Sequence, residues 1–106
     1  HGRVIRGWLG VTVQDITPNL ATTFGLEEVR GGLISEVVRT SPAYQGGLRP
    51  GDVLVGINGK PVQDGYESMN IIAGTKPGTE TVLNVIRNRE QLALNVVIGT
   101  RPRMLE

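Results

Sequence analysis

The sequence has no cysteine, one histidine and few aromatic residues, which make up 4% of its 106 positions. A chain without cysteine forms neither a disulfide framework nor a zinc site with thiolate ligands. His1 stands at the chain end, so no Ser-His-Asp triad is expected, and there is no thiol nucleophile. The acidic residues are scattered, and capping or solvation explains most of them; they include Asp15, Glu27, Glu28, Asp52, Asp64 and Glu67. The sequence therefore predicts no catalytic residue, no metal, no cofactor and no enzymatic activity of this chain.

An excess of charge and a long apolar run are absent as well. The 11 basic and 10 acidic residues are mixed along the chain, without the basic stripe that is typical of nucleic-acid binding. No apolar stretch approaches the roughly 20 residues of a membrane helix, and no signal-peptide pattern is present. We expect neither a nucleic-acid partner nor membrane contact. Short basic pairs near both ends are expected to be solvated; they are Arg3 with Arg6 and Arg101 with Arg103.

What is present fits one globular domain, with 39% apolar and 20% charged residues. We expect a single domain over residues 1–106, folded from about 4 to 99, that forms part of a longer protein. Residues 100–106 are expected to be a tail, in which Leu105 and Glu106 could equally be an expression scar.

Local patterns predict mostly strands. Alternating residues indicate a half-buried strand over 9–16, and further strands are expected over 33–38, 52–57, 81–87 and 92–98. Helix starts are predicted at Thr17-Pro18, at Ser41-Pro42 and at Asp64, where Glu67 completes a capping-box pattern. Hairpin turns are predicted at Asn58-Gly59 and over 88–90. The fold class is α+β, mostly β: a small, partly open barrel or sandwich of five to six strands capped by two to three helices.

The stretch GWLGVTV, residues 7–13, places Gly7 and Gly10 around a bulky apolar pair at the start of a strand. Glycine serves a tight turn, or a backbone that must approach another group closely. The GXXG loop of a KH domain is disfavoured, because the central residues are Trp8 and Leu9 rather than basic ones and a strand follows. A tight turn that merely starts the strand remains an alternative.

A binding role for this loop follows from its backbone amides. If the amides of Leu9, Gly10 and Val11 converge, they form a nest for a small anion. Because Leu9 and Val11 are apolar, a terminal carboxylate with an apolar side chain would satisfy both features. The remainder of such a ligand could extend the sheet along Thr12 and Val13 as an added strand.

Two motifs together resemble PDZ domains. Trp8-Leu9-Gly10-Val11 matches the X-Φ-G-Φ carboxylate loop of that family, and SPAYQGGLRPGDVLVGINGKPV resembles its core signature. The carboxylate loop opens the domain and a strand pair closes it, as in the permuted PDZ domains of bacteria. RGWLGVTVQDIT is most similar to HtrA-type periplasmic serine proteases, particularly the single-PDZ subgroup of DegS and AlgW.

The resemblance implies a site. The amides of Leu9, Gly10 and Val11 would bind a partner's terminal carboxylate, Leu9 and Val11 would line the pocket for its last side chain, and Trp8 would cover the rim. The far wall would be the helix over 66–73. An arc of this helix holds Tyr66, Met69, Ile72 and Ala73, away from Ile71.

On that arc we expect Tyr66 and Ala73 in the core, and Met69 and Ile72 in the groove, with Ser68 at its edge. Packing of the whole arc in the core is the alternative. No histidine begins this helix, so an apolar or aromatic ligand terminus is expected.

The function implied is recognition of free C-termini, those of misfolded outer-membrane proteins, by strand addition in the periplasm. Binding would regulate or feed an attached HtrA-type serine protease during envelope stress. The alternatives are a passive oligomer-assembly domain and a PDZ domain of a different protease or secretion protein.

Overall fold

The computed structural model describes residues 6–101, and the expectations for His1, Arg3, Arg103, Leu105 and Glu106 lie outside this range. The strands are β1 (Gly7–Trp8), β2 (Val11–Asp15), β3 (Gly32–Val37), β4 (Val53–Ile57), β5 (Lys60–Pro61), β6 (Glu80–Arg87), β7 (Glu90–Val97) and β8 (Gly99–Thr100). The helices are α1 (Pro18–Thr23), α2 (Pro42–Gln45) and α3 (Gly65–Ala73). None of these helices is long and apolar enough to cross a membrane.

All three helices begin where the sequence predicts. The N-cap side chains of Thr17, Ser41 and Asp64 accept hydrogen bonds from the amides of Leu20, Tyr44 and Glu67. Proline follows the cap in α1 and α2, where its missing N–H leaves no helical hydrogen bond unmade. In α3, Glu67 Oε1 accepts from the amide of Gln63, one residue before the cap. The predicted starts are confirmed, because capping depends on residues that are close in sequence.

Both predicted hairpins are also confirmed. Asn58 and Gly59 have φ values of 54° and 82°, and Asn88 and Arg89 have 52° and 66°. Positive φ at both central residues is typical of the two-residue turns that match strand twist. Asn58 also fastens its hairpin to the next strand, because its side-chain oxygen accepts from the amide of Val82 at 2.8 Å.

The main sheet is antiparallel, with strand order β2-β3-β4-β6-β7 and with β5 paired to β4. It stays open, with β2 and β7 at its two edges, which agrees with the mostly-β, partly open fold expected. With β5 this sheet has six strands, in agreement with the five to six expected. In residues 6–101, the two-residue strands β1 and β8 form a separate pair, and they are too short to show an alternating pattern.

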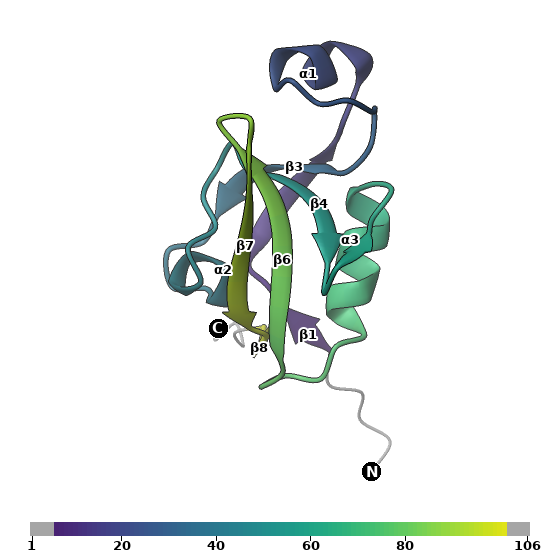
Figure 1. Cartoon of the computed structure of the whole chain (residues 1–106). Helices are drawn as coiled ribbons and strands as arrows, with labels where there is room; N and C mark the ends of the chain where they lie inside the picture. Colours follow the sequence, from purple (N-terminus) through teal and green to yellow (C-terminus); the bar gives the residue numbers. More distant parts are fainter. Residues whose placement is uncertain (1–5, 102–106) are drawn as a thin grey trace, which may run out of the picture.

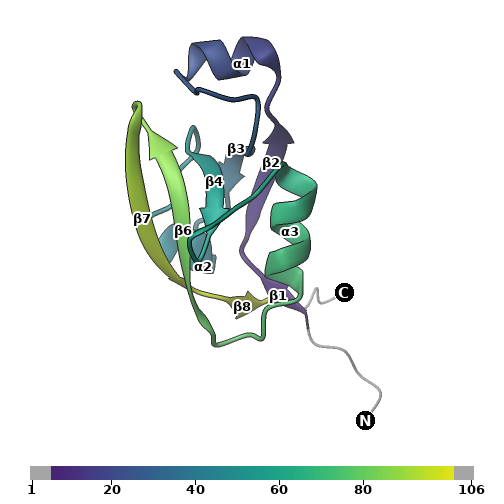
Figure 2. The ribbon, with the colours of Figure 1, turned by 45° about the vertical axis from the view of Figure 1, so that its right-hand side comes forward.

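Two clusters of buried side chains lie on the two faces of the sheet. The main core holds Leu9, Ile34, Leu54, Ile72 and Leu83 among others. A smaller cluster of Ile16, Ala21, Leu33 and Val53 lies beneath α1. Figure 1 shows α1 at one end of the molecule, whereas Figure 2 shows α3 running alongside β2. The strand after the glycine loop thus lies at the edge of the sheet, next to the longest helix.

Candidate functional site

The two glycines of the loop have different structural roles. A Cβ on Gly7 would lie 2.2 Å from the carbonyl oxygen of Ile72 in α3, so glycine here permits close backbone approach. Gly10 has a φ of +89°, and its Cβ would lie 2.2 Å from the Cβ of Ser41. Gly10 therefore meets both requirements, a left-handed backbone and close approach. The loop is held against α3 on one side and against the start of α2 on the other.

Two hydrogen bonds orient the amides of the loop. The carbonyl of Leu9 accepts from the amide of Ala43 at 3.0 Å, and the carbonyl of Gly10 accepts from the amide of Val38 at 2.9 Å. The peptide bonds in the described range are trans, so each N–H points opposite to the carbonyl of the same peptide unit. The amide of Gly10 therefore points away from α2, and that of Val11 points away from β3. Within residues 6–101 the Gly10 amide has no hydrogen-bond acceptor.

The loop side chains are placed on two sides. Leu9 is buried in the main core with 2% of its surface exposed, and half-buried Val11 and Val13 pack against that core. Thr12 faces the other side, where its hydroxyl donates to Glu36 at 3.2 Å. This alternation agrees with the sequence and leaves Val11 and Val13 facing α3.

The buried stripe of α3 differs from the predicted arc. Gly65, Ser68 and Ile72 are its buried residues, and the hydroxyl of Ser68 donates to the carbonyl of Asp64 at 2.9 Å. Ser68 is fully buried and offers no exposed atom to a ligand. The expectation that Tyr66 lies in the core is wrong, because 77% of its surface is exposed.

Other members of that arc lie closer to β2. Met69 is half-buried and packs against the same core as Val11 and Val13, whereas Ile72 is 2% exposed. Ala73 is half-buried rather than fully enclosed. Of the three helix residues expected to bind peptide, Met69 has the most side-chain surface left for a partner. The helix therefore presents one adjustable apolar side chain beside the edge strand.

The spacing between α3 and β2 is set by glycines at both ends of the helix. Gly65 at its start would, with a Cβ, lie 2.6 Å from Cγ1 of Val13. Gly7 lies equally close to the C-terminal end of α3, because a Cβ on Gly7 would lie 2.2 Å from the Ile72 carbonyl oxygen and 2.5 Å from that of Thr75. Any larger residue would push the helix away from the sheet. These contacts hold α3 beside the free edge of β2.

A hollow of about 700 Å³ lies beside the loop, the start of β2 and the end of β3. It is lined by Trp8, Gly10, Val11, Thr12, Ser35, Glu36, Val37, Val38, Pro50 and Arg101. Trp8 therefore borders this hollow. Sequence reasoning missed Val38, which is 47% exposed, although two consecutive valines at the end of a strand must place one on the solvent side.

An ion pair between buried Asp52 and partly exposed Arg87 stabilises the connection between α2 and β4. Asp52 is 1% exposed and accepts from the Arg49 amide at 2.9 Å, and from Nε and Nη2 of Arg87, both at 2.8 Å. Asp52 is thus an exception among the acidic residues, most of which were expected to be capping or solvated. The hydrogen bond from Arg87 to Asp52 raises the pKa of Arg87. Arg87 also donates to the carbonyl of Gly47 at 2.7 Å. The pair therefore stabilises the segment that connects α2 to β4.

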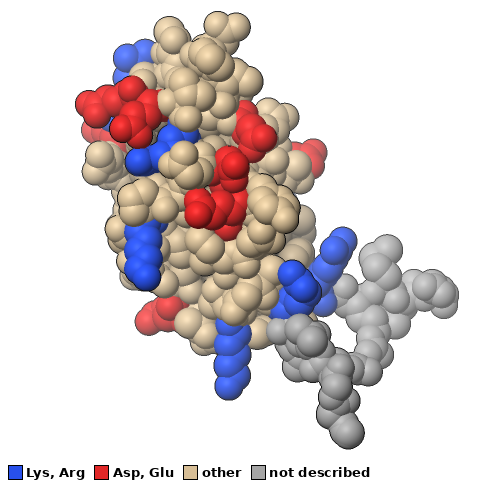
Figure 3. All heavy atoms as spheres, turned by 90° about the vertical axis from the view of Figure 1, so that its right-hand side faces the viewer, with Lys and Arg blue, Asp and Glu red and all other residues tan. Residues whose placement is uncertain are grey.

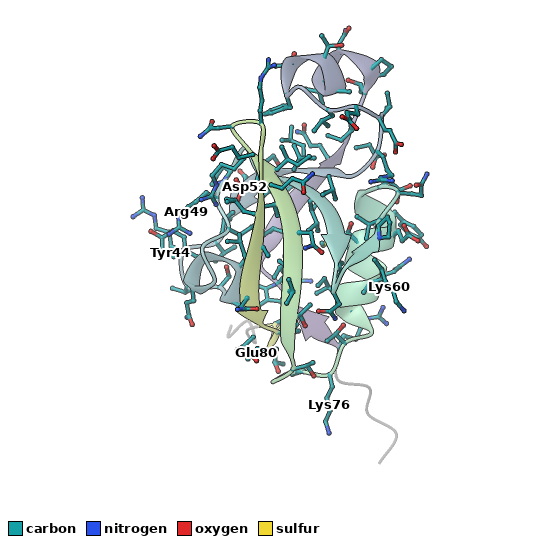
Figure 4. The ribbon with its side chains drawn as sticks, viewed as in Figure 1. Tyr44, Arg49, Asp52, Lys60, Lys76 and Glu80 are labelled. Carbon is teal, nitrogen blue, oxygen red and sulfur yellow. The ribbon has the colours of Figure 1, made fainter. Side chains whose placement is uncertain are left out.

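Arg49 reinforces the same region. Its guanidinium lies 3.9 Å from the centroid of the Tyr44 ring and donates to the carbonyls of Tyr44 and Leu48. Figure 4 shows Tyr44 and Arg49 together at the side of the molecule formed by α2. Through the stacking and these two hydrogen bonds, Arg49 links Tyr44 in α2 to Leu48 in the segment that follows the helix.

Residues 7–98 match the family model described as PDZ domain, and the chain belongs to this family. It is also homologous to HtrA-type serine proteases. It is 41% identical over 101 residues to the "Probable periplasmic serine endoprotease DegP-like" of Ectopseudomonas mendocina (strain ymp), covering 95% of this chain and 21% of that protein. The corresponding protein of Hahella chejuensis (strain KCTC 2396) is 39% identical, with 22% of its length covered. The chain thus spans about a fifth of these curated relatives.

Solved structures give the same result. A structure of the HtrA-type protease AlgW with a decapeptide is 45% identical and superimposes with a TM-score of 0.85, over 98% of this chain and 32% of that one. The PDZ domain of HtrA3 bound to a phage-derived ligand, FGRWV, is 27% identical with a TM-score of 0.76, over 91% of this chain and 88% of that one. The predicted PDZ fold and the resemblance to HtrA-type proteases are confirmed.

Proposed function

We propose that this chain is a peptide-binding module that takes the free C-terminus of a partner and adds the partner's last residues as a strand on β2. The observation that carries this is the orientation of two amides. The bonds to the Leu9 and Gly10 carbonyls turn the N–H groups of Gly10 and Val11 away from α2 and β3. Amides that are not used by the fold can bind a carboxylate.

Strand geometry assigns the side chains of the bound peptide. The N–H and C=O of one residue point to the same side of a strand, so Val11 would pair with the last residue of the partner. Residues that are opposite each other share a face of the sheet. The last side chain therefore lies on the α3 side with Leu9, Val11, Met69 and Ile72. The penultimate side chain lies on the face of Thr12, over the hollow.

The energies of these contacts suit a reversible complex. Burying one large apolar side chain contributes about 1.5–3 kcal/mol, and each charge-assisted hydrogen bond to the carboxylate about 1.5–3 kcal/mol before losses. After the costs of ordering, a micromolar dissociation constant, about −8 kcal/mol, is expected. Such affinity permits both sensing and release.

The HtrA3 ligand supports an apolar terminus, because FGRWV ends in tryptophan and valine. An N-acetylated FGRWV peptide is therefore a suitable probe. Titration calorimetry should show that amidation of its C-terminus weakens binding about tenfold or more, since the negative charge and one acceptor are lost. Equal affinities of acid and amide would refute carboxylate recognition.

In the full-length protein, this domain regulates or feeds an HtrA-type serine protease in the periplasm, and its ligands are exposed C-termini of misfolded outer-membrane proteins. The periplasmic names of the relatives and the peptide complexes of AlgW support this role. Cleavage of an unrelated unfolded substrate by the full-length enzyme is the test. The free-acid peptide should accelerate cleavage if binding activates the protease, and should slow it if binding delivers substrate. No effect of the free acid would contradict both.

A further inference from the structure

The end of the described chain returns to the carboxylate loop. In the β1–β8 pair, Gly7 lies opposite Thr100 and Trp8 lies opposite Gly99. Arg6 directly precedes Gly7 and Arg101 directly follows Thr100, so the two residues flank the same end of this strand pair. Trp8 and Arg101 both line the hollow beside the loop. Arg101, which is far from Gly10 in sequence, thus lies at the same hollow as Gly10.

The charges near this loop are mainly positive. Arg6 and Arg101 are exposed, and neither forms an ion pair within residues 6–101. Glu36 is the acidic residue that lines the hollow, and it accepts from the hydroxyl of Thr12. Figure 3 shows basic atoms at the lower end and lower right of the molecule, and acidic atoms across the middle and at the lower left.

Resting on the proposed function, we infer that Arg101 is a further ligand-binding residue, which attracts the terminal carboxylate of the partner to the loop amides. Arg101 lines the hollow that the loop backbone also lines, and a guanidinium is a strong partner for carboxylates. Arg6, one residue before β1, adds a second exposed positive charge at the same end of the β1–β8 pair. Glu36 opposes it, because it places a negative charge at the same hollow.

Substitutions that remove or keep a single charge test this inference. Arg101→Gln should weaken binding of the free-acid probe about two- to fivefold at low ionic strength, the range for an exposed charge pair. Arg101→Lys should retain most of the affinity, because the charge remains. Glu36→Gln should strengthen binding by a smaller factor. Arg89→Gln is the matched control at the far hairpin, where no change is expected.

Salt and amidation identify the partner charge. The effects of Arg101→Gln and Glu36→Gln should fade at about 1 M salt, where the screening length is about 3 Å. With the amidated probe, Arg101→Gln should change the affinity by much less than with the free acid. An equal loss for both probes would overturn the inference, because Arg101 would then contact an uncharged part of the peptide.

A third probe, in which aspartate replaces the penultimate tryptophan, separates the two sources of a carboxylate. An Arg101→Gln effect that appears only with this probe would overturn the terminal assignment. If the wild-type chain does not distinguish acid from amide, the proposed function itself fails. If it does, and Arg101→Gln leaves that discrimination unchanged, only the role of Arg101 fails.

Discussion

The two edges of the main sheet, β2 and β7, are built differently. Both end the strand order, and both alternate between inward and outward side chains. Beside β2 runs α3, whose half-buried Met69 packs against the same core as Val11 and Val13. Beside β7 lies the end of α2, where a Cβ on Gly46 would lie only 2.9 Å from the Asn95 carbonyl. The β2 edge thus has an apolar wall beside it, whereas the backbone at the end of α2 lies close against the β7 edge.

A second difference concerns the residues that precede each edge. The loop before β2 directs the amides of Gly10 and Val11 outward, through the bonds made by the neighbouring carbonyls. The residues before β7, Asn88 and Arg89, form the two-residue turn of the hairpin that joins β6 to β7. An unpaired edge can accept a strand. Selecting the C-terminal end of a strand also requires hydrogen-bond donors for the negatively charged carboxylate and an apolar wall for the last side chain. Only the β2 edge combines the three.

The largest effect is expected from Gly10→Ala. A left-handed backbone costs alanine roughly 1–2 kcal/mol, and the contact with Ser41 adds about 1–3 kcal/mol. Urea unfolding should therefore show a loss of about 3 kcal/mol, together with loss of probe binding. Gly51→Ala is the matched control, because Gly51 has a φ of +96° and no atom within 4 Å of its Cβ position. If Gly10→Ala and Gly51→Ala lost the same free energy of unfolding, the close contact with Ser41 would add no cost.

Arg87→Met should destabilise the fold without affecting the β2 edge. It removes two hydrogen bonds from buried Asp52, and a loss of about 2 kcal/mol is expected after allowance for the partial exposure of Arg87. The stability of Arg87→Lys should lie between that of Arg87→Met and that of the wild type. Denaturation and probe titration together test this, since a large change in affinity with unchanged stability would contradict a structural role.

Met69→Asp compares the two edges directly. We expect probe affinity to fall about thirtyfold, on the order of 2 kcal/mol, because the wall loses apolar contact and gains a charge. Val97→Asp on β7, where Val97 is 55% exposed, should leave the affinity unchanged. Light scattering would show an altered oligomeric state with preserved affinity if the domain served assembly instead.

The smallest effect is expected from Tyr66→Ala. Because Tyr66 is largely exposed, its removal should change the free energy of unfolding by no more than about 0.5 kcal/mol. Thermal and urea denaturation of the variant measure this. A loss of several kcal/mol would instead support the core position that the helical arc suggested.

Most of the fold could be predicted because its signals are local. The caps at Thr17, Ser41 and Asp64 and the turn at Asn58-Gly59 each depend on a few neighbouring residues. The candidate loop could be found for the same reason, since its glycines and apolar residues are contiguous. The short strand β8 could not be found, because two residues carry no periodicity and Thr100 pairs with Gly7, far away in sequence.

The amino-acid sequence by itself determined the strand that follows Gly10, the helix starts and the family. Only the tertiary structure decided which stripe of α3 is buried, because small Gly65 and Ser68 carry little hydrophobic signal yet allow the helix to approach the sheet. The tertiary structure also decided that Asp52 is paired with Arg87 and that Arg101 lies near the loop. Periodicity gives relative directions within one element, whereas burial and charge pairing depend on distant segments that meet only in the fold.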